Sequence, residues 1–193
     1  MLRALYDWTM GIAGHRRAMP GLAAVSFVES SVFPIPPDVM IIPMVLAARH
    51  KAWAIAGLAT LASVLGGALG YGIGFGLYES VGRPILELYG HSDRFAEFQQ
   101  AFNDLGWWLV IGAGITPFPY KVITIASGVT GLDFVTFMLA SVVGRAGRFF
   151  LVAGLLWAFG PPIRAFIEKN LGMMTLLFFI ALFGGFLAIR YVF

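Results

Sequence analysis

Five charged residues lie inside stretches of the sequence that are otherwise apolar. The acidic ones come from the first half of the chain and the basic ones from the second; they are Glu29, Asp38, Lys121, Arg145 and Arg148. Charged groups at membrane depth are costly and usually mark a substrate or ion pathway. Guanidinium groups bind phosphate oxygens through paired hydrogen bonds. These residues therefore predict a site for a phosphate-bearing molecule, with the carboxylates as fixed salt-bridge partners or as sites of proton uptake.

The composition places these charges in a membrane protein with a single membrane domain, residues 1–193. Hydrophobic residues make up 59% of the chain and charged residues 12%, whereas a soluble domain is about half apolar and a quarter charged. The absence of cysteine excludes disulfides and thiolate metal sites. The three histidines are scattered, so we expect neither a metal site nor a cofactor. The net charge of +3 favours contact with lipid over nucleic acid.

Two proline-rich segments interrupt the apolar stretches. Their prolines are Pro34, Pro36 and Pro37 in the first segment and Pro117 and Pro119 in the second. Proline lacks a backbone donor and disfavours helix at the residue before it. The flanking arms are about ten residues long, too short to cross a bilayer. We therefore expect two re-entrant loops, residues 20–49 and 106–130. Five ordinary spans would instead thread Glu29, Asp38 and Lys121 through lipid.

The remaining apolar runs are long enough to cross a membrane. We expect spans at residues 52–78, 134–159 and 171–190, a polar extramembrane segment at 79–105, and an interfacial amphipathic helix at 1–19. We also expect a turn at 127–131 and a helix cap at Asp133. In the first span, the four-residue spacing is typical of helices that pack closely in lipid and would allow a homodimer; it places glycine at Gly66, Gly70 and Gly74.

A short internal repeat relates the two halves of the chain. Residues 62–68, Ala-Ser-Val-Leu-Gly-Gly-Ala, match residues 140–146, Ala-Ser-Val-Val-Gly-Arg-Ala, without a gap. The predicted fold is all-α: two inverted repeats, each a proline-broken re-entrant helical hairpin plus a transmembrane helix, and a C-terminal transmembrane helix. The distribution of Lys and Arg then places the N-terminus in the cytoplasm. We expect a multi-pass protein of the inner (plasma) membrane.

The same residues resemble the DedA family, also called the SNARE-associated or VTT-domain family. The resemblance covers roughly residues 20–159 and is carried by Glu29…Phe33-Pro-Ile-Pro-Pro-Asp38, by Pro117-Phe-Pro-Tyr-Lys121 and by Gly144-Arg145. It implies paired inverted re-entrant loops and the movement of phospholipids or polyprenyl-phosphate carriers between leaflets, with dependence on the proton gradient proposed for bacterial members.

One position departs from the family pattern. Many members carry two arginines around the second proline motif, but here an uncharged residue lies near Ile115 or Thr116 and the later position is Lys121. Lysine lacks the planar fork of arginine. This departure leaves open whether substrate choice and coupling follow the family.

The leading functional hypothesis is a flippase or scramblase for a phosphate-bearing phospholipid or polyprenyl-phosphate, with proton coupling left open. The alternatives are a proton-coupled secondary transporter of a small ion or solute and a non-transporting membrane organiser whose charges are fully paired. We do not expect an enzyme and name no catalytic residue. Ser127-Gly128 is the nearest match to a nucleophile motif, and no histidine lies at membrane depth to activate it.

Overall fold

The computed structural model describes residues 18–32, 36–84, 86, 92–116 and 118–169. Within these ranges there is no strand, which confirms the predicted all-α class. The helices are α2 (Ala18–Ser31), α3 (Asp38–Ala47), α4 (Ala52–Leu77), α6 (Ser92–Ile115), α7 (Tyr120–Val129) and α8 (Phe134–Lys169), with a 3-10 turn η1 (Arg49–Lys51) and a π-helical turn η2 (Tyr78–Gly82). Most of the predicted N-terminal amphipathic helix and the span at 171–190 lie outside the described residues.

Among the residues that the structure describes, two helices are long and apolar enough to cross a membrane. One candidate span covers Arg49–Gly82 and includes α4, and the other is Phe134–Gly160 within α8. The 26 residues of α4 extend for about 39 Å, more than the roughly 30 Å thickness of a hydrocarbon core. These helices coincide with the first two predicted spans. At the end of the second span α8 bends at Phe159, whose φ of −114° and ψ of 20° are not helical.

Shorter helices begin and end at the proline-rich segments, as predicted from the chemistry of proline. Helix α2 ends at Ser31 and α3 begins directly after Pro37; α6 ends at Ile115 and α7 begins directly after Pro119. With 10 residues each, α3 and α7 extend for about 15 Å, half the thickness of a hydrocarbon core.

Two boundaries differ from the prediction. The expected turn at 127–131 is limited to Thr130 and Gly131, because α7 continues to Val129. Gly128 lies within α7, where a Cβ would collide with the carbonyl oxygen of Tyr71, so its missing side chain allows close packing rather than a turn. In addition, the part of the polar segment from Ser92 onward and the apolar arm that follows it belong to one continuous helix, α6.

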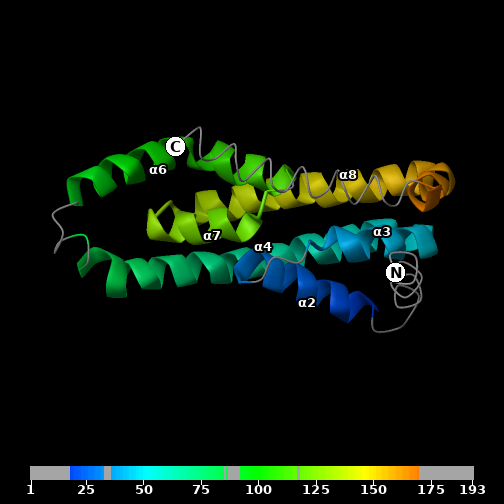
Figure 1. Cartoon of the computed structure of the whole chain (residues 1–193), viewed down its shortest axis with the longest axis horizontal. Coiled ribbons are helices and arrows are strands. Elements are labelled where there is room, and N and C mark those ends of the chain that lie inside the picture. The colour runs from blue at the N-terminus through cyan, green and yellow to red at the C-terminus, as the bar shows by residue number, and fades with distance from the viewer. Residues whose placement is uncertain (1–17, 33–35, 85, 87–91, 117, 170–193) are drawn as a thin grey trace.

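The four helices next to the breaks pack on the two candidate spans, α4 and α8. Helices α2 and α7 pack on α4, whereas α6 and α3 pack on α8. In Figure 1, α3 lies toward the end of the molecule where α8 finishes, and α7 lies toward the opposite end. Thus α2 and α6, which precede a break, each contact the long helix that comes next in sequence. After the breaks, α3 contacts α8 and α7 contacts α4.

Glycine allows α4 to approach its neighbours closely, as the four-residue spacing predicts. A Cβ on Gly66 would collide with the carbonyl oxygen of Phe27 in α2, and one on Gly74 would collide with that of Ile125 in α7. A Cβ on Gly70 would meet Thr124. These three glycines are therefore covered within the chain, so a homodimer would have to use another surface.

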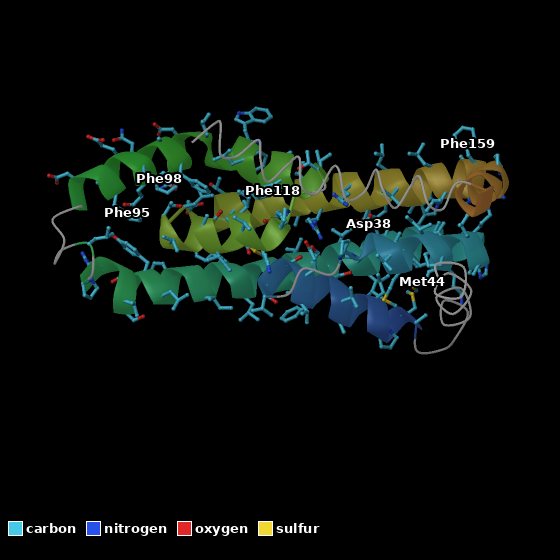
Figure 2. The ribbon with its side chains drawn as sticks, in the orientation of Figure 1. Asp38, Met44, Phe95, Phe98, Phe118 and Phe159 are labelled. Atoms are coloured by element: carbon cyan, nitrogen blue, oxygen red, sulfur yellow. The ribbon has the colours of Figure 1, made fainter. Side chains whose placement is uncertain are left out.

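The core contains two apolar clusters with polar side chains between them. On α8, one cluster ends at Ala140 and the other begins at Phe149, while Ser141 and Arg145 lie buried in between. We call the polar side chains at this level, which form several separate hydrogen-bonded groups, the polar layer; its members are Glu29, Ser30, Asp38, Ser63, Tyr120, Lys121, Thr124, Ser141, Arg145 and Arg148. In Figure 2 Asp38 lies well away from both ends of the long axis, with Phe159 near one end and Phe95 near the other.

Candidate functional site

The innermost contact of the polar layer is an ion pair between Glu29 of α2 and Arg145 of α8. The Nη2 atom of Arg145 lies 2.7 Å from Oε2 of Glu29, and the two side chains are 2% (Arg145) and 9% (Glu29) exposed. The guanidinium lies over two aromatic rings, with Cζ 4.7 Å from the ring centre of Tyr120 and 4.6 Å from that of Phe149. Aromatic faces attract a cation, so both rings stabilise Arg145 in addition to Glu29.

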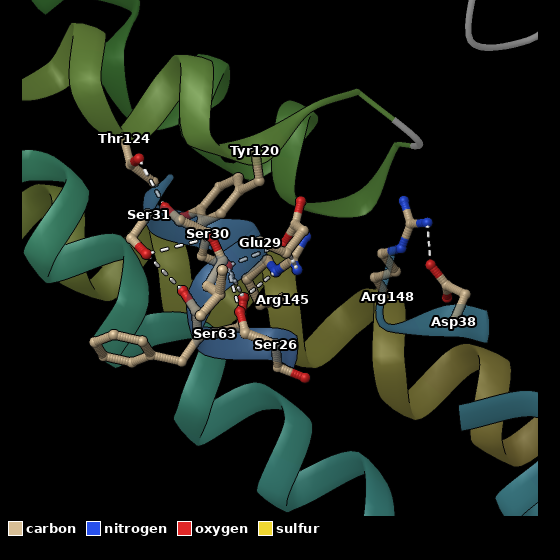
Figure 3. A network of polar contacts seen from close by, with 12 residues as sticks. Ser26, Glu29, Ser30, Ser31, Asp38, Ser63, Tyr120, Thr124, Arg145 and Arg148 are labelled. Carbon is tan, nitrogen blue, oxygen red and sulfur yellow. Dashed lines mark hydrogen bonds and ion pairs between the residues drawn. The ribbon is translucent and has the colours of Figure 1, made fainter. Parts of the chain in front are cut away.

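Two serines connect the ends of this ion pair. Nε of Arg145 donates to Oγ of Ser63 at 2.5 Å, and Oγ of Ser63 lies 2.6 Å from Oγ of Ser30. The Ser30 hydroxyl in turn donates to Oε2 of Glu29 at 3.1 Å. Figure 3 shows these contacts converging from three helices, α2, α4 and α8. The charges are therefore compensated by hydrogen bonds as well as by each other, as a buried ion pair requires.

The second ion pair joins Asp38 to Arg148 and is partly exposed. Nη2 of Arg148 lies 2.6 Å from Oδ2 of Asp38, and the two side chains are 17% (Arg148) and 18% (Asp38) exposed. Nη1 of Arg148 donates to the carbonyl oxygen of Thr116, just after α6 ends. Arg148 thus bridges the first residue of α3 and the backbone at the second break.

Lys121 reaches the backbone at the first break. Its Nζ donates to the carbonyl oxygen of Val32, just after α2 ends, at 3.3 Å. Within the described part of the chain, no carboxylate lies within ion-pair distance of Lys121. A cation near the last carbonyl groups of a helix is favourable, so Lys121 and Arg148 each stabilise the end of a broken helix.

Four of the five predicted site residues thus form two separate ion pairs, whereas Lys121 contacts the backbone of Val32. The three-residue spacing of Arg145 and Arg148 does place both in the polar layer, on one face of α8. They contact different carboxylates rather than forming one basic cluster. Pro36, Pro37 and Pro119 lie directly at the breaks, whereas Pro34 and Pro117 lie outside the described residues.

Several contributing residues were not identified from the sequence as site residues: Ser30, Ser63, Tyr120, Thr124 and Ser141. Hydroxyl side chains in apolar helices carry no signal of their own, because they can bond to the carbonyl four residues earlier. One signal was present for two of them. Ser63 and Ser141 occupy equivalent positions in the internal repeat.

Comparison with known proteins identifies the family. The chain matches the family model of the VTT domain over residues 35–158. It is 39% identical to an uncharacterized protein of Haemophilus influenzae over 167 residues, 86% of each chain. It is also 39% identical to an uncharacterized protein of Histophilus somni, over 86% of this chain and 87% of that one. No solved structure matches the chain significantly. These matches confirm the resemblance seen in the sequence: the chain belongs to the VTT domain family of membrane proteins, the family of the DedA proteins.

Proposed function

We propose that this protein moves a phosphate-bearing lipid, a phospholipid or a polyprenyl-phosphate, between the leaflets of a membrane. The observation that carries the proposal is the partly exposed pair of Asp38 and Arg148. Its guanidinium lies in the polar layer, between the ends of the broken helices, where a lipid headgroup crossing the bilayer needs a cationic partner. Arg148 binds the phosphate when it exchanges Asp38 for the ligand, and Lys121 supplies a second positive charge at the other break.

The inner pair has a different role in this proposal. Arg145 is buried, its guanidinium lies over the rings of Tyr120 and Phe149, and its hydrogen bonds go to Glu29 and Ser63. Releasing it for a ligand would leave the Glu29 carboxylate buried without a partner, which is costly. The pair of Glu29 and Arg145 therefore acts as a fixed strut that holds α2 against α8.

The proposal includes two inverted repeats with re-entrant hairpins, α2–α3 and α6–α7. Equivalent contacts support this arrangement. Gly66 of α4 packs on the backbone of Phe27 in α2, and Gly144 of α8 packs on the backbone of Ile111 in α6. Gly66 and Gly144 are equivalent positions of the sequence repeat. Both contacts join a helix that precedes a break to the long helix that follows it.

The proposed orientation is a multi-pass protein of the inner membrane with the N-terminus in the cytoplasm. The two ends of the membrane domain differ in charge, which supports it. Exposed Arg49, His50 and Lys51 precede α4, whereas exposed Glu79, Arg83 and Asp93 follow it, so Lys and Arg are more numerous at the first of these ends. Lys and Arg are enriched on the cytoplasmic side of membrane proteins.

Reconstituted liposomes test the proposal. Purified protein is incorporated with a fluorescent phospholipid, and the fraction of label accessible to an external quencher is followed over time. Wild-type protein should accelerate transfer over empty liposomes, and Arg148→Gln should slow it by roughly tenfold or more, because a charged hydrogen bond is lost. Lys51→Gln, which removes an exposed charge outside the polar layer, should transfer like the wild type. Transfer by the wild type at the rate of empty liposomes would refute the proposal.

The buried pair of Glu29 and Arg145 also favours a second candidate, a non-transporting membrane organiser. Fully compensated charges can serve the specificity of folding rather than transport. The same assay separates the two, because an organiser produces no transfer in any variant. Coupling to protons is tested by imposing a pH gradient across the liposomes and comparing the rates in its two directions.

A further inference from the structure

Both serines of the internal repeat converge on Arg145. Ser63 of α4 and Ser141 of α8 occupy the same place in the repeated Ala-Ser-Val-x-Gly sequence. Ser63 bonds directly to the guanidinium, and Ser141 bonds to the tyrosine that covers it. We propose that the two serines are positioning residues, which orient Arg145 and thereby set the register of α8 that places Arg148 opposite Asp38. This inference rests on the transport function proposed above.

The direct arm of this arrangement has a fixed hydrogen-bond direction. Arginine can only donate, so Oγ of Ser63 accepts from Nε of Arg145 at 2.5 Å. Ser63 keeps its own hydrogen, which it can donate to Oγ of Ser30, 2.6 Å away. The Ser30 hydrogen serves Oε2 of Glu29 at 3.1 Å and the carbonyl oxygen of Ser26 at 3.0 Å. Arg145 is therefore linked to Oε2 of Glu29 in two ways, by a direct hydrogen bond and through Ser63 and Ser30.

The indirect arm holds the aromatic cover in place. The Tyr120 hydroxyl donates to Oγ of Ser141 at 2.5 Å, and both side chains are buried. The tyrosine ring lies on one face of the guanidinium, at 4.7 Å. A planar ring attracts a cation only in a suitable orientation, so the hydrogen bond at the far end of the ring fixes the face that Arg145 meets.

The repeat explains why a serine occurs at both positions. In each copy a glycine follows the serine by three residues, which places both on one face of the helix. The glycines, Gly66 and Gly144, allow α2 and α6 to approach within backbone contact. In each copy the serine lies on the same helix face as the glycine and therefore reaches the polar layer. There it lies next to a helix that carries a charged residue or packs opposite one.

Ser127 offers a matched control. It is as buried as Ser63, but its hydroxyl donates to the carbonyl oxygen of Ile123 in its own helix, at 2.7 Å. Ser127→Ala therefore removes the same atom from a buried site without changing the contacts of Arg145.

A double-mutant cycle in thermal unfolding tests the proposal independently of transport. Ser63→Ala, Glu29→Gln and the double variant are unfolded in detergent, and the same cycle is measured with Ser127→Ala. Coupled residues give non-additive effects. We expect the Ser63 cycle to depart from additivity by about 2–4 °C in Tm, and the Ser127 cycle to be additive. A cycle with Ser141→Ala and Tyr120→Phe should also be non-additive, because each change removes the same hydrogen bond. An additive Ser63 cycle would overturn the inference.

Lipid transfer supplies the functional readout. Ser63→Ala should slow transfer about three- to tenfold at unchanged incorporation into liposomes, the effect of one lost hydrogen bond, while Ser127→Ala should leave the rate unchanged. Equal rates for the two variants would overturn the positioning role. If the wild type itself moves no lipid, the proposed function fails, and the cycles alone decide whether the serines position Arg145.

Discussion

Arg49 donates hydrogen bonds to the carbonyl oxygen of Trp157 and, at 3.5 Å, to that of Ala158, directly before the bend in α8. In a continuous α-helix these oxygens would accept from the backbone N–H groups of residues 161 and 162. Both of those residues are prolines, which have no N–H group. The guanidinium thus takes the place of two missing helix hydrogen bonds, and it ties the turn after α3 to the end of the second long helix.

Because Pro161 and Pro162 cannot donate to these oxygens, we expect Arg49 to stabilise the protein. Arg49→Ala should lower the free energy of unfolding by about 1 kcal/mol, at the low end of the cost of unsatisfied acceptors because water can reach the site. The measurement is thermal unfolding in detergent. In a Pro161→Ala/Pro162→Ala variant, the backbone N–H groups of residues 161 and 162 can donate to these oxygens. In that variant, Arg49→Ala should therefore lower the free energy of unfolding by less. An equal cost in both backgrounds would show that Arg49 acts in another way. Lys51→Ala, two residues further along and also exposed, serves as the control.

The buried ion pair predicts a second pattern of stability. Arg145→Gln or Glu29→Gln leaves one charge buried without a partner, which should cost about 3–5 kcal/mol. Combining the two should recover part of that loss, because no charge then remains uncompensated at this depth. The unfolding midpoints of the four proteins give the coupling. A double variant that is as unstable as the sum of the single ones would contradict the compensation of these charges.

The features that proline and helix geometry determine locally could be predicted from the sequence. Pro37 and Pro119 directly precede helices, and Arg145 and Arg148 share a face because they are three residues apart. Salt bridges of Glu29 and Asp38 with the basic residues were one of the two expected roles, but which carboxylate pairs with which arginine could not be predicted, because it depends on how α2, α3 and α8 pack.

Tertiary packing also explains what was missed or misplaced. Gly66 and Gly74 were recognised as contact positions, but spacing alone does not reveal that the partners are α2 and α7 of the same chain. Gly128 suggested a turn, but it lies within α7, and the backbone of Tyr71 in α4 packs against it. Ser63 was visible in the repeat, but its role depends on a guanidinium 82 residues later.

Close packing around α4 predicts opposite outcomes for two neighbouring glycines. A Cβ on Gly66 would overlap the backbone of Phe27, whereas a Cβ on Gly72 would meet nothing within 4 Å. Gly66→Ala should therefore separate α2 from α4 and destabilise the protein by about 1–3 kcal/mol. Gly72→Ala should be neutral or slightly stabilising, because alanine favours helix over glycine. Thermal unfolding compares them, and equal effects would argue against the close contact of α2 and α4.

The start of α8 predicts a dependence of stability on pH. Oδ2 of Asp133 accepts a hydrogen bond from the backbone N–H of Thr136 at 2.7 Å, which confirms the predicted cap. This bond to the charged form holds the pKa of the Asp133 carboxyl below its ordinary value. Because the pKa is lower in the folded protein than in the unfolded chain, the cap contributes its full stability above the unfolded pKa of about 4. That contribution is lost as the pH falls through the lower, folded value.

Asp133→Asn keeps a side-chain acceptor for the Thr136 amide but cannot titrate. The Tm difference between wild type and Asp133→Asn should therefore be constant near neutral pH. Below about pH 4 the Tm of the wild type should fall relative to that of Asp133→Asn. Asp133→Ala should lower the Tm at neutral pH, because it leaves the amide of Thr136 without this acceptor. A difference between wild type and Asp133→Asn that does not change down to pH 3 would show that the carboxylate of Asp133 does not stabilise α8 through its charge.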